Sequence, residues 1–291
     1  MKQNELGMGV VIGCSKVESV SNWFCENLFF EKLEDTASGS IIANESCILY
    51  LEKAVEAERP VSVDKATYAC GLEHIALNTA DIKKAASYLR SRGLELDIEG
   101  EDFSYNPKVF GDGEYYFHVK NEFGLIIEIS QKANVDKADG ADERIISGLD
   151  HYGIPCMDFD RETSFFRELG FSFVFEPVEN YNDIEGHIKC VMMEKDSVIL
   201  EIYEFTDRRG MIKKDNGNLR GLVMDKKSDV SPSGVGIVPA EGYDIVAIGE
   251  CLVDILCREE DGVLRMEGNP GGAPANVLAM AARLGMATAM A

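Results

Sequence analysis

The chain contains two pairs of residues in which a histidine is followed, at nearly equal spacing, by a glutamate: His74 with Glu128, and His151 with Glu201. Each histidine lies near the start of a strand-like segment, and each glutamate lies inside an apolar one. A carboxylate in an apolar strand is costly to bury without a partner. Two imidazole nitrogens and two carboxylate oxygens on one face would form a ligand set suited to zinc, nickel, cobalt, manganese or iron(II).

Period-two alternation places each glutamate on the face opposite its apolar neighbours. In residues 124–129 alternate apolar side chains share one face and Glu128 lies on the other, and Glu201 takes the same place in residues 197–203. The two histidines occupy matching positions in the opening strands. An alternative interpretation stays open, in which the histidines are core or rim residues and the glutamates point to solvent.

The elements that would position these residues repeat in the order β-α-β-β-β. In residues 71–129, Asp81 is expected to cap a helix that ends at Gly93, with Ile82, Ala85, Ala86 and Leu89 on one face. In residues 148–203, Asp160 is expected to precede the corresponding short helix. The sequence therefore predicts an α+β fold that contains repeated βαβββ modules.

A weaker copy of the module comes first, in residues 10–51. It has no histidine, and Tyr50 stands about where the other copies have glutamate. We expect residues 1–133 to hold modules one and two and residues 147–206 to hold the third. An unpaired module would expose a sheet edge and an apolar face, which favours a homodimer or an unconventional packing.

These modules resemble the vicinal-oxygen-chelate superfamily, which includes glyoxalase I, bleomycin-resistance proteins, epimerases and extradiol dioxygenases. The resemblance covers about residues 8–206 and is carried by residues 71–77, 121–129, 149–151 and 198–202. It implies a repeated βαβββ fold in which the first-strand histidine and the last-strand glutamate of two paired modules hold a metal.

By this resemblance His74, Glu128, His151 and Glu201 would be the metal ligands. The metal would act as a Lewis acid on two neighbouring oxygens of a small oxygenated metabolite. Glu128 or Glu201 would also move a proton, as a catalytic base. Many members of the superfamily bind ligands without a metal, so a metal-free binding or regulatory module is the second hypothesis.

The other histidines and the cysteines suggest no further site. His118 and His187 lie in strand-like segments at positions that do not match each other, and we interpret them as structural or surface residues. The eight cysteines include no Cys-x-x-Cys, so buried, reduced thiols are expected rather than a zinc–thiolate site.

Residues 207–242 have the composition of an exposed linker, with basic doublets among Gly, Ser, Pro and Asp. A buried-strand pattern returns at residues 243–250. Residues 271 and 272 form a Gly-Gly turn that opens a helix expected over residues 275–284.

Gly249-Glu250-x-x-x-Asp254, together with residues 271–276, is similar to the beginning of a PfkB/ribokinase-family sugar kinase of fructokinase type. The resemblance covers residues 243–291 and implies the first β/α segment of a ribokinase-like α/β domain. Sugar hydroxyls would then contact Asp254, Gly271, Gly272 and Asn276. The catalytic aspartate and ATP site of that family lie further along its chain. We therefore expect a truncated kinase segment or fusion without phosphoryl transfer, with ATP and Mg²⁺ needed only by a full-length kinase.

The composition and net charge of the chain limit the classes of partner that it is expected to bind. A net charge of −22 over 291 residues repels phosphate backbones and anionic membranes, so neither nucleic acid nor a membrane is expected as a partner. The N-terminus lacks a signal-peptide layout, and no apolar run approaches the roughly 18 residues of a membrane helix, which favours a cytoplasmic protein. A small molecule is the expected partner.

Overall fold

The structure is a computed structural model of the chain. It describes residues 8–54, 70–98, 102–109, 112–133, 144–182, 186–207, 219–224, 229–233, 235–239, 245–247, 252–260, 263–271 and 288–290. The chain divides into two compact units, one of which is Leu6–Val238 while the other contains Pro239–Ala291. The candidate site lies in the first of them.

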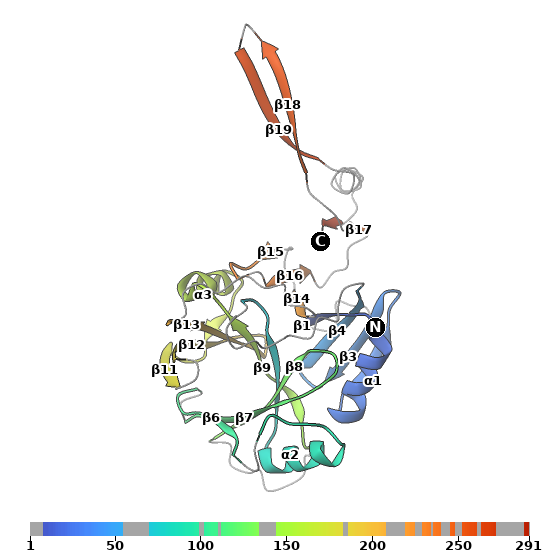
Figure 1. Cartoon of the computed structure of the whole chain (residues 1–291), viewed down its shortest axis with the longest axis vertical. Helices are drawn as coiled ribbons and strands as arrows, with labels where there is room; N and C mark the ends of the chain where they lie inside the picture. Colours follow the sequence, from blue (N-terminus) through green and yellow to red (C-terminus); the bar gives the residue numbers. More distant parts are fainter. Residues whose placement is uncertain are drawn as a thin grey trace. The chain divides into compact units, whose positions relative to one another are not determined.

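Each predicted module of this unit contributes one helix to the structure: α1 (Val17–Asn27), α2 (Ile82–Ser91) and α3 (Phe159–Glu168) (Figure 1). Helix α2 confirms its prediction. The Asp81 carboxylate accepts a hydrogen bond from the Lys84 amide at 3.1 Å, and Gly93 follows the helix with φ of 81°. The face of α2 that packs on the sheet consists of the expected residues Ile82, Ala85, Ala86 and Leu89.

Helix α3 begins two residues earlier than predicted. Its cap is Asp158, which has extended backbone angles and accepts a hydrogen bond from the Arg161 amide at 3.0 Å. Asp160 lies in the first turn instead. Both aspartates suit a helix start, and only the extended backbone at Asp158 allows its carboxylate to reach a free amide of the first turn.

The strands follow the modular order. Module one contains β1 (Gly9–Cys14), β2 (Glu31–Asp35), β3 (Gly39–Asn44) and β4 (Cys47–Lys53). Module two contains β5 (His74–Asn78), β6 (Ser104–Asn106), β7 (Glu114–Val119) and β8 (Ile126–Lys132). Module three contains β9 (Ser147–Pro155), β10 (Ser172–Phe173), β11 (Val178–Asn182), β12 (Gly186–Lys195) and β13 (Val198–Phe205).

Modules two and three form one nine-stranded sheet. Its order is β10-β12-β13-β9-β5-β8-β7-β6, with β11 also paired to β12. The first strands β5 and β9 run antiparallel to each other, and each runs parallel to the last strand of its own module. Modules two and three are therefore the pair that shares this sheet, a pairing that the sequence left open. This pairing also places both His/Glu pairs in one sheet.

Module one pairs with strands from the segment predicted to be a linker. These strands are β14 (Leu219–Met224), β15 (Asp229–Val230) and β16 (Gly236–Pro239), in a seven-stranded sheet of order β15-β16-β14-β1-β4-β3-β2. Strand β14 runs antiparallel to β1 as β9 does to β5. Part of residues 207–242 is therefore sheet rather than exposed linker, and it takes the place of a partner module.

Apolar burial explains why this segment joins the sheet. Five of its buried residues belong to the same hydrophobic core as modules one to three, and they are Leu219, Leu222, Met224, Val235 and Ile237. In the sequence they are separated by charged residues and glycines that hide the strand pattern. The basic doublets at 208–209, 213–214 and 226–227 lie outside the described residues. Because every module has a partner within the chain, the reason given for a homodimer no longer applies.

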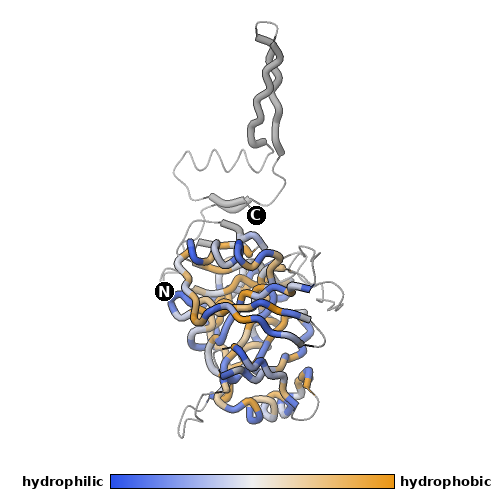
Figure 2. Tube along the Cα trace, turned by 90° about the vertical axis from the view of Figure 1, so that its left-hand side faces the viewer, coloured by the Kyte–Doolittle hydropathy of each residue, from blue (hydrophilic) through white to orange (hydrophobic). Residues whose placement is uncertain are grey.

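The larger of two hydrophobic clusters runs through the unit Leu6–Val238. It contains the helix-facing residues of both sheets together with the buried faces of α1, α2 and α3. Figure 2 shows hydrophobic segments (orange) alternating with hydrophilic ones (blue) along the trace of this unit. In the described part of the chain, no helix is long and apolar enough to cross a membrane.

Glu162 of α3 ties module three to the β15–β16 turn. The side chain is fully buried, and Oε2 accepts a hydrogen bond from the Ser233 amide at 2.9 Å. Burial raises the pKa of this carboxyl above its ordinary 4.5. A carboxyl whose pKa is higher in the folded than in the unfolded chain destabilises the fold increasingly as pH rises above the unfolded value.

We expect Glu162→Gln, which keeps an acceptor but cannot ionise, to gain stability relative to the unmodified protein as pH rises. The gain should begin above the ordinary pKa of the carboxyl and level off once the pH exceeds its raised pKa. Urea unfolding of both proteins across this range measures it. A stability difference that does not change with pH would contradict the assignment.

The second unit contains β17 (Ile245–Ala247), β18 (Leu252–Glu260), β19 (Val263–Gly271) and β20 (Thr288–Met290). Strands β18 and β19 form an antiparallel hairpin, and β17 pairs in parallel with β20. Asp254 lies in β18 and Gly271 ends β19. Gly272, Asn276 and the helix expected over 275–284 lie outside the described residues.

Candidate metal centre

The four predicted ligands lie on adjacent central strands of the nine-stranded sheet. His74 begins β5, His151 lies in β9, Glu128 in β8 and Glu201 in β13. Gly153 of β9 pairs with His74 of β5 and with Glu201 of β13. Ala76, two positions after His74, pairs with His151 and with Glu128. Because paired positions and positions two apart share a face, all four side chains project from one side of the sheet.

The four side chains converge. Nε2 of His74 lies 3.1 Å from Nε2 of His151. Oε2 of Glu201 lies 3.7 Å from Nε2 of His74 and 3.6 Å from Nε2 of His151. Oε1 of Glu128 lies 3.6 Å from Nε2 of His151. His74, Glu128 and His151 are buried, and 16% of the Glu201 side chain is exposed.

These distances fit one metal ion. Ligand atoms at 2.0 to 2.2 Å from a four- to six-coordinate ion lie roughly 3 to 4 Å from one another. Imidazole nitrogens mixed with carboxylate oxygens suit a borderline transition metal rather than Ca²⁺ or Mg²⁺. The donor set and its spacing therefore suit the kind of ion that the sequence predicted.

Gly153 leaves room for the His74 ring. A Cβ atom added at Gly153 would overlap the imidazole of His74. The backbone of Gly153 is not in the left-handed region, so its role is to provide space rather than an unusual turn. His74 can point into the cluster because β9 has no side chain at this position.

Carboxylates that immediately precede each histidine orient the two rings. Oδ1 of Asp150 lies 2.9 Å from Nδ1 of His151, and Oε2 of Glu73 lies 3.5 Å from Nδ1 of His74. The register of β5 with β9 shifts at Asp150, which is the extra residue of a β-bulge. A bulge brings two consecutive side chains towards one face, so Asp150 can reach the ring that follows it. Both contacts turn Nε2 towards the centre of the cluster.

The cluster distributes its charge unevenly. Burial alone would lower the pKa of His151, but the hydrogen bond that its ring donates to Asp150 and the surrounding glutamates raise it to about 10. Burial alone would raise the pKa of Glu128, but His118 and the cluster histidines lower it to about 2. For Glu201 burial prevails over the histidines and raises the pKa. A proton on His151 must therefore leave before a metal binds.

His118 belongs to this site, which the sequence interpretation missed. Its Nε2 lies 3.2 Å from Oε2 of Glu128, and its Nδ1 lies 2.8 Å from Oδ2 of Asp97. His118 and Glu128 pair directly across β7 and β8. The signal was present in the chain, since both residues lie five positions from Phe123 in the turn between these strands.

His187 lies apart from the cluster, as expected. Its Nδ1 is 2.7 Å from Oδ2 of Asp207, and its ring contacts Tyr181 with centroids 4.9 Å apart. In module three the residue that pairs with Glu201 is Met192. A histidine next to the predicted glutamate ligand is therefore found in module two and not in module three.

Module one carries no equivalent ligands. In module two, Glu128 pairs with the residue two positions after His74, and in module one Tyr50 pairs with Val11 in the same way. Tyr50 therefore occupies the position of the glutamate, as predicted. By the same register Gly9 replaces the first histidine. A Cβ atom at Gly9 would lie 2.9 Å from the Tyr50 ring, so tyrosine fills the space.

The concave face around the cluster has one apolar wall. On the side of Glu201, strands β12 and β13 present Cys190, Met192, Tyr203 and Phe205, which pack against the fully buried Val109. Val109 reaches them because the ends of the sheet meet, where Nδ2 of Asn180 donates to Oδ1 of Asn106 at 2.7 Å.

The wall on the side of Glu128 is polar. Strands β7 and β8 present Tyr116, His118, Ser130 and Lys132 on the same face as Glu128. Glu114 is also buried here, next to Ser130, and burial raises the pKa of its carboxyl to about 8. The two walls would contact chemically different parts of a bound molecule.

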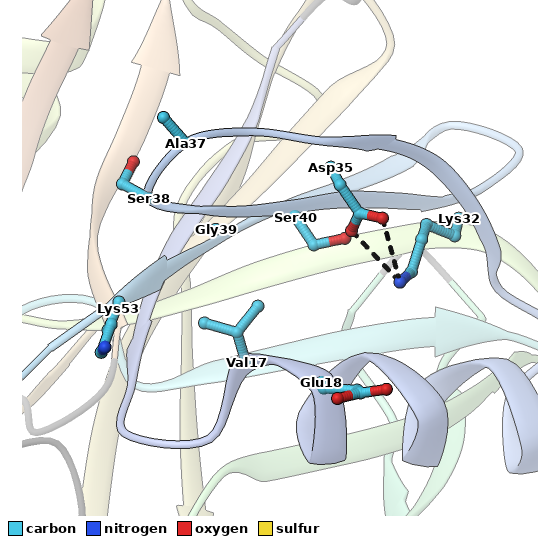
Figure 3. Close-up of a pocket in the computed structure, with 9 residues that line it drawn as sticks. All are labelled: Val17, Glu18, Lys32, Asp35, Ala37, Ser38, Gly39, Ser40 and Lys53. Atoms are coloured by element: carbon cyan, nitrogen blue, oxygen red, sulfur yellow. Dashed lines mark hydrogen bonds and ion pairs between the residues drawn. The ribbon is translucent and has the colours of Figure 1, made fainter.

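A surface cavity of about 420 Å³ lies in module one, away from these residues in the sequence. It is lined by the start of α1 and the β2–β3 turn, with an exposed ion pair between Lys32 and Asp35 at 3.1 Å (Figure 3). None of the four predicted ligands lines it. We assign no chemistry to this cavity.

Comparison with solved structures identifies the fold. Glyoxalase I from Zea mays matches with a TM-score of 0.53 at 13% sequence identity, over 80% of this chain and 91% of the maize protein. A provisionally named dioxygenase from Bacillus subtilis subsp. subtilis strain 168 matches with a TM-score of 0.51 at 10% identity, over 75% of this chain and 69% of that one. No family model and no curated protein matches the sequence.

The chain therefore contains a domain with the vicinal-oxygen-chelate fold. The paired βαβββ modules of the nine-stranded sheet and the structural neighbours agree on this class. At these identities the likeness concerns the fold alone. The comparisons give no support to a sugar-kinase segment in residues 243–291.

Proposed function

We propose that His74, Glu128, His151 and Glu201 bind one divalent transition metal, and that this site acts on a small oxygenated metabolite as a glyoxalase-type isomerase or lyase. The convergence of the buried His74, Glu128 and His151, with Glu201 within 3.7 Å of both imidazoles, supports the proposal. When bound, such a metal supplies Lewis-acid polarisation of two neighbouring substrate oxygens.

The two glutamates are not equivalent in this proposal. His118 and the cluster histidines keep Glu128 ionised, with the pKa of its carboxyl lowered to about 2. The pKa of Glu201 is raised, and Glu201 pairs with no histidine other than the two predicted ligands. A base works best when its pKa lies near the working pH. Glu201 therefore suits proton transfer better, and Glu128 suits a purely ligating role.

A metal-free binding domain is the second candidate, and one observation favours it. The four side chains already contact one another, with the two Nε2 atoms 3.1 Å apart and Glu201 within ion-pair distance, 3.7 Å or less, of both rings. A buried polar cluster paired in this way is stable without an ion. The concave face would then bind a ligand by hydrogen bonds alone.

Metal content separates the two candidates. We expect the purified protein to retain about one zinc, nickel, cobalt, manganese or iron ion per chain, measured by elemental mass spectrometry. A His74→Ala/His151→Ala variant should lose it, because the remaining carboxylates cannot hold a transition metal alone. His187→Ala is the matched control and should keep it. Protein that stays metal-free after incubation with these ions would favour the binding domain.

The sugar-kinase segment stays a proposal from the sequence. In it, Asp254, Gly271, Gly272 and Asn276 would contact sugar hydroxyls, and ATP with Mg²⁺ would serve only a full-length kinase. We expect no ATP-dependent phosphorylation of fructose by the 291-residue chain. Phosphorylation by the purified chain would contradict this.

A further inference from the structure

The strongest unassigned feature is a line of three side chains that leads from the protein surface to the predicted metal position. Asp97 accepts hydrogen bonds from the His118 backbone amide at 2.6 Å and from Nδ1 of its ring at 2.8 Å. The opposite ring nitrogen, Nε2, faces Oε2 of Glu128 at 3.2 Å. The other oxygen of Glu128, Oε1, faces His151 at 3.6 Å.

This arrangement divides the two oxygens of Glu128 between two tasks. Both ring nitrogens of His118 face carboxylate oxygens, which are acceptors only, so both nitrogens carry a proton. A charge-assisted hydrogen bond then holds Oε2 away from the cluster. Only Oε1 is directed towards the histidines. Asp97 binds both the backbone amide and the ring Nδ1 of His118, so the position of Nε2 is well determined.

We propose that His118, held by Asp97, is a positioning residue that restricts Glu128 to one metal-binding oxygen. The inference rests on the proposed metal site and adds two residues to it. Partners of this kind next to a ligand typically change metal affinity by about 10- to 100-fold when removed. His118 itself is not a ligand, because its Nε2 faces the carboxylate rather than the other histidines.

The chain provides a matched control. His187 makes the same double contact with Asp207, through its backbone amide at 2.9 Å and its Nδ1 at 2.7 Å. It lies on β12, whose residue opposite Glu201 is Met192, so it contacts none of the predicted ligands. Replacing His187 therefore removes an equivalent histidine–aspartate pair without touching the site.

The test measures the dissociation constants of Zn²⁺ and Co²⁺ by competition with a chromogenic chelator, and the visible spectrum of the Co²⁺ protein. His118→Phe, which keeps a ring but no donor, should weaken binding about 10- to 100-fold and change the Co²⁺ spectrum. His118→Gln restores a donor and should bind within about threefold of the unmodified protein. Asp97→Asn, at a half-exposed position, should give an intermediate loss. His187→Phe should change neither readout.

The outcomes separate this inference from the proposed function. Unmodified protein that binds neither ion overturns both. Unmodified protein that binds, together with His118→Phe and Asp97→Asn that bind equally well with unchanged Co²⁺ spectra, overturns the positioning role alone. If His118→Phe fails to fold, as circular dichroism of the metal-free proteins would show, His118→Gln and Asp97→Asn decide. Equal losses in His118→Gln, His118→Phe and His187→Phe would indicate a merely structural role and also overturn it.

Discussion

Replacing Gly153 by alanine is expected to weaken metal binding by about 100-fold or more while the protein stays folded. The new Cβ atom would overlap the His74 ring, which must then rotate away from the cluster. Glu201 of β13 pairs with Gly153 from the other side of β9, so its side chain would be displaced as well. The backbone conformation of Gly153 is one that alanine also adopts, so the substitution should affect mainly the metal site. The chelator competition described above measures the loss.

Gly93→Ala provides the opposite control. Nothing lies within 4 Å of a Cβ atom at Gly93, but its φ of 81° is strained for alanine. This variant should lose about 1 kcal/mol of stability and keep its metal affinity. If Gly153→Ala bound metal as tightly as the unmodified protein, His74 would not be a ligand in the orientation seen here. A Gly153→Ala protein that unfolds would show instead that the ring position serves the fold.

Local patterns predicted the parts of the site that depend on one strand at a time. Alternation around Glu128 and Glu201 identified the face opposite the core, and the structure places both residues on that face. The cap at Asp81 and the buried side of α2 were also predicted, because a helix end depends on residues a few positions apart. Such features are decided by neighbours in the sequence.

The parts that were missed depend on contacts between distant segments. The choice of module two as the partner of module three follows from the antiparallel pairing of β5 and β9, which strand alternation does not encode. The bulge that turns Asp150 towards His151 is a register shift between those same strands. Strand β14 was missed because an arginine and a glycine interrupt its apolar residues, which form a strand only against β1. His118 needed the hairpin register of β7 with β8.

Asn44→Ala is expected to be among the most destabilising single substitutions, by about 3 kcal/mol or more. The Asn44 side chain is fully buried at the end of β3 and joins the two sheets. Its Nδ2 donates to Leu28 O at 2.8 Å and to Ile146 O at 3.3 Å, and its Oδ1 accepts from the Gly148 amide at 3.2 Å. Alanine would leave these buried backbone groups without that partner, at about 1 to 3 kcal/mol each where no replacement forms.

The effect should extend to the metal site, because β9 begins next to these contacts and carries His151. Ser46→Ala is a control with a smaller expected effect. In this contact Ser46 accepts one hydrogen bond, from the Leu149 amide at 3.0 Å, so its loss should cost about 1 kcal/mol of stability. Urea unfolding followed by the fluorescence of Trp23, the single tryptophan, reports on module one. Release of bound Co²⁺ in the same titration reports on the nine-stranded sheet. If Asn44 couples the two sheets, the fluorescence change and the Co²⁺ release occur at the same urea concentration in the unmodified protein. In Asn44→Ala both should occur together at a lower urea concentration. Co²⁺ release that is unaffected by this substitution would mean that the modules holding the site are stable without module one.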